Sequence, residues 1–384
     1  MPRKETPGNA TLAEPRRALD AAASLVPRLA AAEPEHDLAG RAAIANLELL
    51  GEEGFLLLNV PDSFGGFGEG LGGTLEILRT VAQGSPSTAL MLAMHTSILA
   101  NYLIDPRHVP PAERTAFIEQ RTWAFGEAMR GRRFGVANSE PGAGGDVKQS
   151  RAEMRDGRVW GVKSFCSMGT HADYFMTAAR DFESQKRDFE SQKNDESGHV
   201  RYWLVRNENV SVESAWDAVG MRSSESVSLR FDGAPVLAPL AYRGLLDGVN
   251  NRHWSTLSFT AIFIGVAESL LDDVLTPGAS TLQRTSATEL HLTLQACRAF
   301  LRHCVAIEPD PATDDYRREV RDCKLFVTRA LAQHAAALFT SLGGSAYRFG
   351  SPVSRKVRDL LAGPLLRPPV GAAFDEVFAE LVAT

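Results

Sequence analysis

The most constraining feature of the sequence is a change of period between Phe134 and Ala178. A short apolar run ends at Asn138, a loop of small residues covers Gly142–Asp146, and an alternating apolar pattern begins at Trp160. Alternation with a period of two is typical of β-strands, and glycines let the backbone approach a ligand closely because they carry no Cβ. The stretch therefore predicts strands joined by a ligand-binding loop.

Helical periodicity flanks these strands on both sides, with apolar residues recurring at three- and four-residue spacing before residue 105 and again after about residue 241. The helical segments are predicted at 15–53, 71–83, 87–104, 254–274, 286–305 and 316–342, and further strands at 202–205 and 227–231. We therefore predict an α+β fold in three parts. A helical domain covers residues 1–132, a barrel-like β domain covers 133–240, and a helical bundle covers 241–384.

The composition restricts the class of protein. The chain has 384 residues and a formal net charge of −6, which argues against nucleic-acid binding. We expect a cytoplasmic protein with no membrane association, because no apolar run reaches the length of a membrane span and the first residues lack a signal-peptide core. The four cysteines, Cys166, Cys297, Cys304 and Cys323, have no metal-ligand spacing, so we expect reduced thiols and no metal site.

Two motifs carry a family resemblance. Ser139-Glu140-Pro141-Gly142-Ala143-Gly144-Gly145-Asp146 is followed by Lys163-Ser164-Phe165-Cys166-Ser167-Met168-Gly169, in that order. Together they resemble the flavin-binding β domain of the acyl-CoA dehydrogenase superfamily, which includes related flavin monooxygenases. Trp216 with Gly220-Met221-Arg222, and the closing Gly343-Gly344 with Arg358-Asp359, extend the resemblance over most of the chain.

The resemblance implies a fold, a cofactor and partners. The fold is an N-terminal helical bundle, a β-barrel-like middle and a C-terminal four-helix bundle. The cofactor is FAD, either weakly bound or replaced by reduced FMN or FAD as a co-substrate. The substrate is an acyl-CoA or an acyl-carrier-protein thioester, the assembly is a homodimer or tetramer, and an electron-transfer partner is possible.

The resemblance also implies site residues. The residues expected at the cofactor are Ala137, Asn138, Ser139, Phe165, Cys166, Ser167, Gly343 and Gly344. Those expected at the substrate are Gly145, Arg222 and Trp254. Ser139 and Ser167 match hydroxyl positions beside the flavin, and Phe165 matches an aromatic shield over one face of the ring.

The catalytic base is where the sequence departs from the family pattern. Most members carry a glutamate nine positions after the arginine of the closing Arg-Asp, and here that position is Arg367. A minority carry it on the first helix of the last bundle, where this chain has Ser255. An arginine cannot accept a proton near neutral pH. A shifted loop with Asp375 or Glu376 is the remaining source of a base.

His95 has two interpretations. It lies in a segment that is apolar on nearly every face, which indicates a buried core histidine bonded to backbone. Flavin monooxygenases of the resembled superfamily place a histidine in the same helix near the reactive edge of the flavin. His95 is therefore also a candidate catalytic residue, together with Arg367 and Ser255.

Three functions remain open from the sequence. The first is a flavin-dependent oxidoreductase acting on acyl thioesters, with Arg367 in place of the usual glutamate. The second is a flavin monooxygenase of the same fold, which needs no base for a proton alpha to a carbonyl. The third is a non-catalytic subunit or scaffold, which the altered base positions would also fit.

Overall fold

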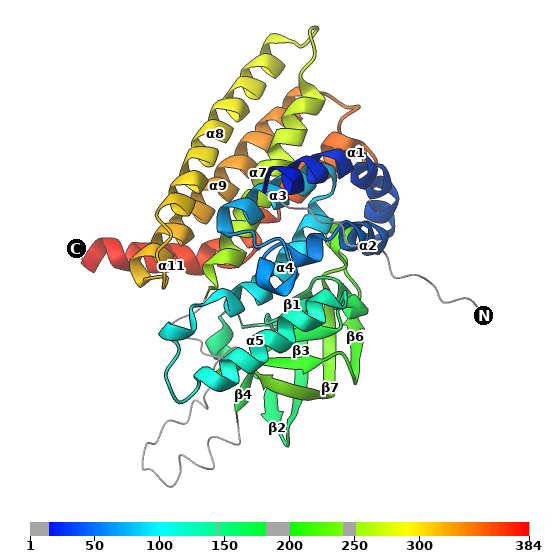
Figure 1. Ribbon diagram of the computed structural model, residues 1–384. Coiled ribbons are helices and arrows are strands. Elements are labelled where there is room, and N and C mark those ends of the chain that lie inside the picture. The colour runs from blue at the N-terminus through cyan, green and yellow to red at the C-terminus, as the bar shows by residue number, and fades with distance from the viewer. Residues whose placement is uncertain (1–14, 144–145, 182–199, 241–250, 384) are drawn as a thin grey trace.

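The computed structural model describes residues 15–143, 146–181, 200–240 and 251–383. Helices, a closed sheet and further helices follow one another along the chain, as the colours of Figure 1 show. The predicted fold class, an α+β fold of the acyl-CoA dehydrogenase type, is confirmed.

Five α-helices precede the sheet. They are α1 (Pro15–Ala39), α2 (Ile44–Glu52), α3 (Leu71–Gly84), α4 (Pro86–Ala100) and α5 (Arg114–Met129). α4 is buried on every face, and its start is fixed by Pro86 in the first turn and by Ser85, whose side chain accepts from the Thr88 amide. α5 was not predicted, because its apolar residues do not keep a regular helical spacing.

The central sheet has seven strands in the described residues. They are β1 (Phe134–Ala137), β2 (Glu153–Arg155), β3 (Arg158–Cys166), β4 (Tyr174–Asp181), β5 (Val200–Arg206), β6 (Val210–Ser214) and β7 (Val227–Pro239). The neighbours run β4–β2–β3–β7–β5, and β5 pairs back to β4, so these five strands form a closed ring. β1 adds to β4 in parallel and β6 to β7 antiparallel. Closure leaves the five ring strands without free edges.

Five further α-helices follow the sheet in the described residues. They are α7 (His253–Val274), α8 (Thr281–Ala306), α9 (Asp314–Ser341), α10 (Pro352–Leu360) and α11 (Val370–Ala383). α8 begins at a capping box in which Ser280 and Gln283 exchange side-chain and backbone hydrogen bonds. By length and composition α7 is the one helix of the described chain that could span a membrane. However, 83% of its most apolar window is buried inside the protein, as in a core helix.

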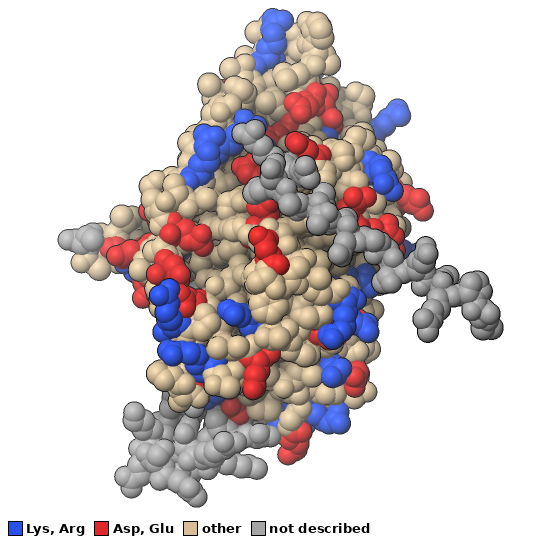
Figure 2. Space-filling model, in the orientation of Figure 1, with Lys and Arg blue, Asp and Glu red and all other residues tan. Residues whose placement is uncertain are grey.

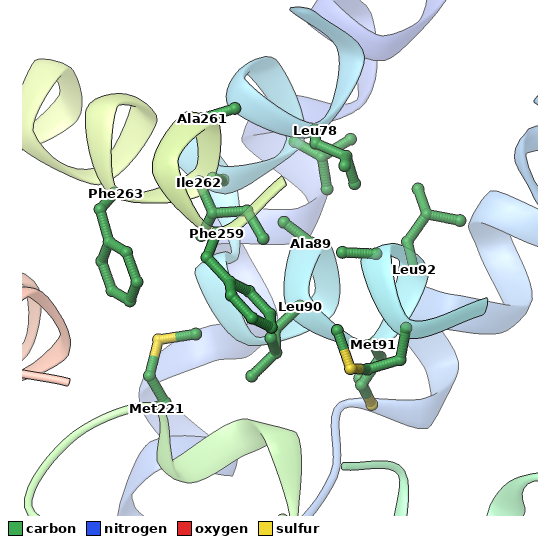
Figure 3. Packing of buried hydrophobic residues seen from close by; sticks show 14 of the residues in the cluster. Leu78, Ala89, Leu90, Met91, Leu92, Met221, Phe259, Ala261, Ile262 and Phe263 are labelled. Carbon is green, nitrogen blue, oxygen red and sulfur yellow. The ribbon is translucent and has the colours of Figure 1, made fainter. Parts of the chain in front are cut away.

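The core joins all three parts. Figure 3 shows Leu90 and Met91 of α4, Phe259 and Phe263 of α7, and Met221 from the β region converging on one cluster. Met221 belongs to the turn that follows Gly220, so burial of its side chain in this cluster also holds that turn in place.

Two glycines permit close contacts between the parts. A Cβ on Gly265 of α7 would lie 2.1 Å from the Arg79 carbonyl oxygen of α3, and one on Gly220 would lie 2.1 Å from the Arg358 carbonyl oxygen of α10. Any larger residue would push these elements apart. The glycine of the Gly220-Met221-Arg222 motif therefore allows the β region to dock on the last helices.

Charged side chains are spread over the surface. On the face shown in Figure 2, lysines and arginines are interspersed with aspartates and glutamates. Exposed apolar side chains instead gather on α11, which extends away from the rest of the molecule in Figure 1 and exposes Phe374, Phe378, Leu381 and Val382.

Candidate functional site

The glycine loop is anchored by one buried ion pair. Glu140 accepts from Lys163 Nζ at 2.5 Å and from the hydroxyl of Ser150 at 2.5 Å. It also accepts from the backbone amides of Arg151 and Ala152. Burial opposes its ionisation, but Lys163 and these donors together lower the pKa of Glu140. Glu140 is therefore an ionised structural anchor that fixes the backbone on both sides of the loop.

The ends of β1 and β3 meet at Ser139. The amide of Ser164 donates to the Ser139 carbonyl at 2.8 Å, in a bridge just beyond the regular strands. The next residue, Phe165, leaves 63% of its surface exposed and has a φ of 57°, which is rare for a bulky residue. The structure therefore brings the two predicted cofactor segments, around Ser139 and Phe165, together.

Backbone strain concentrates in this region. Six non-glycine residues of the described chain have positive φ angles, and four of them lie at the end of β3, in the turn after it and in the turn before β7. These four are Phe165, Met168, Met221 and Glu225. Conformations of this kind persist only where the surroundings enforce them, and they cluster at functional sites.

Three buried hydroxyls form a chain between the end of β3 and the start of β7. Ser167 Oγ lies 2.9 Å from Ser226 Oγ, which lies 2.8 Å from Ser224 Oγ. Ser224 donates to the Met221 carbonyl at 2.7 Å. The same carbonyl accepts from the indole of Trp216, whose ring meets Phe165 edge-on with 6.0 Å between centroids. The Met221 carbonyl therefore anchors both the chain of hydroxyls, through Ser224, and the aromatic pair, through Trp216.

Arg367 lies in the loop between α10 and α11 and is half-buried. Burial lowers the pKa of its guanidinium, while Tyr202, Asp146 and Glu140 act in the opposite direction. These three groups belong to the β region, so the guanidinium lies within electrostatic range of it. The position where the family pattern expects a carboxylate is thus occupied by a half-buried cation whose Nε is buried.

Lys324 holds the Arg367 loop in place. Its ammonium group is fully buried in α9 and donates to the carbonyls of Leu366 at 2.6 Å and Pro368 at 2.7 Å, with Pro364 at 3.5 Å. Burial lowers the pKa of Lys324 to about 7. Two of these carbonyls flank Arg367 directly, so Lys324 fixes the backbone from which the guanidinium extends.

The site contains buried polar atoms without partners. In the part of the chain that the structure describes, Asn138 Oδ1, Ser164 Oγ and Arg367 Nε are buried and accept or donate no hydrogen bond. Such groups are costly to leave unpaired and call for a ligand or water. Together with the exposed ring of Phe165, they fit a planar heteroaromatic ligand such as a flavin.

Both ring nitrogens of His95 are bonded to backbone groups of the protein. The ring is fully buried, Nε2 lies 2.8 Å from the Leu56 carbonyl, and Nδ1 accepts from the Phe134 amide at 3.2 Å. Burial lowers the pKa of the imidazole to about 4, so it is neutral at pH 7. Both nitrogens are used within the protein. The core interpretation of His95 holds, and the catalytic one is corrected, because neither nitrogen is free for a substrate.

The predicted substrate residues are dispersed. Trp254 is buried and donates from its indole to Glu308 at 3.2 Å, and Ser255 donates to the Arg252 carbonyl within the first turn of α7. Arg222 donates to the carbonyls of Asp37 and Ala218. It therefore joins α1 to the β region, which corrects the prediction of a charge free to face a ligand. Gly145 lies outside the described residues.

The predicted cofactor residues divide into two groups. Ala137 ends β1, and Asn138 and Ser139 follow it, with Ser139 bridged to Ser164 next to Phe165. The Cys166 side chain points into the core, where burial raises the pKa of its thiol to about 12. Gly343 and Gly344 are exposed in the turn after α9. In the single chain, the Ser139 carbonyl accepts from the Ser164 amide next to Phe165, whereas the glycine pair lies in the turn after α9.

The alternative carboxylates do not supply a base at Arg367. Asp375 and Glu376 both lie on α11 and are exposed, and Glu376 is 3.5 Å from Arg321 of α9. A shifted loop that brings either one to the Arg367 position is therefore not observed. The described residues contain no cluster of three metal-ligating side chains.

Two site residues were missed from the sequence. Lys324 lies among the apolar positions of the 316–342 helix, one residue after Cys323. A charged residue at a position that faces the core is unusual, and this could have identified Lys324 from the sequence. Ser226 carried no signal, because a single serine before a strand is commonplace. Its role depends on Ser167, which is 59 positions away in the sequence.

The comparisons with known proteins agree with this geometry. Residues 16–106 match the family model described as the acyl-CoA dehydrogenase N-terminal domain. The amino sugar nitrososynthase DnmZ of Streptomyces peucetius is 25% identical over 378 residues, covering 92% of this chain and 89% of the relative. The putative acyl-CoA dehydrogenase YdbM of Bacillus subtilis (strain 168) is 25% identical over 374 residues, covering 91% of each.

The solved structures give the same fold. KijD3 in complex with FMN and dTDP-3-amino-2,3,6-trideoxy-4-keto-3-methyl-D-glucose superimposes with a TM-score of 0.78 at 23% identity. The match covers 98% of this chain and 95% of that one. Fold and site thus define a helix–barrel–helix protein with a candidate flavin site. The predicted resemblance to the acyl-CoA dehydrogenase superfamily is confirmed in the match of residues 16–106, and the solved structures share the fold.

Proposed function

We propose that this chain is a flavin-dependent monooxygenase that oxidises a heteroatom of a small anionic substrate. The observation that carries the proposal is the half-buried Arg367, with a buried Nε that has no partner, at the position of the family's base, and Ser255 at the alternative position. Neither side chain can remove a proton alpha to a thioester carbonyl. Oxygen transfer to a heteroatom does not require that step.

The residues of the site have distinct proposed roles. Asn138, Ser139 and Ser167 would hold the flavin ring, and Phe165, supported by Trp216, would cover one face of it. Bound in the reduced form, a flavin supplies the two electrons that activate molecular oxygen. Arg367 keeps its charge at any accessible pH, so it would pair with a carboxylate or phosphate of the substrate and orient the reacting atom.

The relatives support a nitrogen atom as the oxidised centre. DnmZ is named an amino sugar nitrososynthase, and a second relative is named L-evernosamine nitrososynthase. KijD3 binds FMN together with an amino sugar linked to a nucleoside diphosphate. An amine carried on an anionic molecule would suit both Arg367 and this chemistry. We therefore propose an anionic amine as the substrate class.

The acyl thioester oxidoreductase predicted first remains the second candidate. The putative acyl-CoA dehydrogenase YdbM is as similar to this chain as DnmZ is, which favours it. This candidate would use FAD, an acyl-CoA or acyl-carrier-protein substrate and an electron-transfer partner. It requires a base from elsewhere. A non-catalytic scaffold is the third candidate, and the partnerless polar atoms beside Phe165 argue against it.

One experiment separates these candidates. Purified protein is titrated with FMN and FAD in both redox states. It is then assayed with reduced flavin, oxygen and a panel of anionic amines, and in parallel with acyl-CoAs and an artificial electron acceptor. We expect substrate-dependent oxygen incorporation and no turnover of acyl-CoAs.

Arg367→Glu is the matched variant. It should abolish oxidation of anionic amines, because it replaces the cation with a repelling charge, and it should be the form in which any acyl-CoA oxidation arises. A general base contributes about 10²–10⁴ in rate. Brisk turnover of acyl-CoAs by the unaltered protein would overturn the proposal, and failure to bind any flavin would favour the scaffold.

A further inference from the structure

The segment that carries Arg367 surrounds a buried cation. Lys324 is fully buried, and its Nζ donates to the carbonyls of Leu366 at 2.6 Å and Pro368 at 2.7 Å, with the Pro364 carbonyl at 3.5 Å. Three carbonyl oxygens that converge on one point repel one another unless a positive charge lies between them. The arrangement of this segment therefore suits the ammonium form of Lys324.

Lys324 has no counter-charge in the part of the chain that the structure describes. Burial is the one cause of its lowered pKa, so no charged group of α7, α8, α10 or α11 acts on it. The charged groups beside it on α9 and α11 pair with each other, because Arg321 donates to both oxygens of Glu380 and lies 3.5 Å from Glu376. An unpaired buried charge is costly, so Lys324 favours a bound group that brings negative charge close to it.

Arg367 is a second cation without an ion pair among the described residues. Asp146 and Glu140 act on its guanidinium, but Asp146 is exposed and Glu140 already binds Lys163 at 2.5 Å. The Nε of Arg367 is buried and has no hydrogen-bond partner. Lys324 binds carbonyls of residues on both sides of Arg367, so the two positive groups meet at one short segment. Together they bring two positive charges to the same part of the molecule.

We propose that Lys324 acts through Arg367 to make the candidate site prefer a dianion, such as a phosphate monoester, over a monoanion, such as a carboxylate. The inference rests on the proposed function, in which Arg367 binds the anionic group of the substrate, and it decides between the two groups named there. Arg367 makes the contact with the anion. Lys324 is a positioning residue that holds the loop and adds its charge from the opposite side.

The size of the effect follows from Coulomb's law. At about 10 Å and an effective dielectric constant of about 20, one unit charge changes the affinity for a monoanion roughly tenfold. The interaction energy doubles for a dianion, so the affinity changes roughly a hundredfold. The charge of Lys324 therefore separates the two kinds of anion by about a factor of ten.

The test uses sulfate and methanesulfonate, which have similar shapes but carry two charges and one. Neither changes its charge between pH 6 and pH 8. Their affinities for the unaltered protein are measured by titration calorimetry at pH 6 and constant ionic strength, without flavin. We expect sulfate to bind about tenfold more tightly. Arg367→Gln should abolish the binding of both anions, which assigns the site to this residue.

Two neutral variants isolate the charge of Lys324. Lys324→Met and Lys324→Gln should weaken methanesulfonate about tenfold and sulfate about a hundredfold, so the preference for sulfate is lost. A purely structural role would weaken both anions by the same factor. Lys324→Gln retains N–H donors for the carbonyls, so it keeps the test valid if Lys324→Met loosens the loop. Lys356→Met, which removes a lysine that donates to the Ser269 carbonyl, is the matched control and should retain the preference.

Proton uptake gives a second measurement of the same effect. Burial lowers the pKa of Lys324 to about 7, so most of it is neutral at pH 8 in the free protein. A dianion bound nearby raises this pKa, because it stabilises the charged form. Sulfate binding at pH 8 should therefore take up about one proton. The uptake is measured by calorimetry in buffers with different ionisation enthalpies, and it should be absent in Lys324→Gln.

The outcomes separate this inference from the proposed function. An equal loss of both anions in the Lys324 variants, or the same proton uptake in Lys324→Gln, would overturn the inference and leave Arg367 as an anion site. If the preference for sulfate is found but no oxygen is transferred to any anionic amine, the inference stands and the proposed reaction is wrong. If the unaltered protein binds neither anion, the inference and the proposed role of Arg367 both fail.

Discussion

At the scale of single residues, the hydrogen-bond partners of His95 and Arg367 distinguish a structural residue from a candidate ligand-binding residue. His95 is surrounded by one acceptor and one donor, so its neutral form is fully satisfied. Arg367 is also buried in part but keeps an unpaired Nε. The first arrangement is typical of a structural residue and the second of one that awaits a ligand. The sequence predicted both as catalytic, because residue type alone does not reveal the partners.

His95 should make the protein sensitive to acid. Its pKa is about 4 in the folded protein and 6.5 in the unfolded chain, so the unfolded state binds more protons between these values. The free energy of unfolding should therefore fall as the pH is lowered from 6.5 towards 4, with a contribution of roughly 3 kcal/mol from this residue.

The measurement is urea unfolding at several pH values, with His95→Gln as the comparison. Glutamine carries a donor and an acceptor but does not titrate, so the difference in stability between the two proteins isolates the histidine. A pH dependence that is the same in both proteins would contradict the prediction.

At the scale of elements, the sequence predicts what is periodic and misses what depends on distant contacts. The helices from His253 to Ser341 and the strand β7 were predictable because their apolar spacing is regular. The position of the Arg367 loop was not, because the lysine that holds it lies more than 40 residues earlier on α9. Likewise, the hydroxyl chain joins β3 to the turn before β7, and only the fold brings these segments together.

Lys324 should control the order of the Arg367 loop. Lys324→Met fills the same space but removes the donors to the Leu366 and Pro368 carbonyls, at a cost of about 1–3 kcal/mol in local stability. By hydrogen exchange followed with mass spectrometry, the loop over residues 363–369 should exchange about 5- to 150-fold faster.

Lys356→Met is the control for this loop. Lys356 also donates to a backbone carbonyl, that of Ser269, and to Asp273, but at the other end of the bundle. Its replacement should leave exchange in the 363–369 loop unchanged. Equal exchange of the loop in both variants would show that Lys324 does not hold it.

At the scale of the whole molecule, one helix ties the three parts together. Arg358 of α10 donates to both carboxylate oxygens of Asp37 at the end of α1, and its guanidinium lies 4.1 Å above the ring of Phe349. Asp359 accepts from the Met221 amide at 2.6 Å. The carbonyl that ends the hydroxyl chain therefore belongs to a turn clamped by the last bundle. Docking of the parts thus fixes the geometry of the candidate site.

α11 is fixed to the bundle on one side and exposes apolar side chains on the other. Arg321 of α9 holds it through both oxygens of Glu380, at 2.7 and 2.8 Å. Its outer face exposes Phe374, Phe378 and Leu381, which recur at helical spacing along one stripe. Exposed apolar stripes of this kind are typical of protein interfaces.

We therefore predict a homodimer or tetramer that buries this stripe. Light scattering at micromolar concentration should give at least twice the mass of one chain. The double variant Phe378→Glu/Leu381→Glu should shift the protein to monomers. Each buried Phe or Leu contributes about 1.5–3 kcal/mol, so losing two weakens association by at least about a hundredfold. The double variant Ala372→Glu/Ala379→Glu adds the same charges on another side of α11 and should remain associated. A monomeric unaltered protein, or equal association of both variants, would assign the interface to another surface.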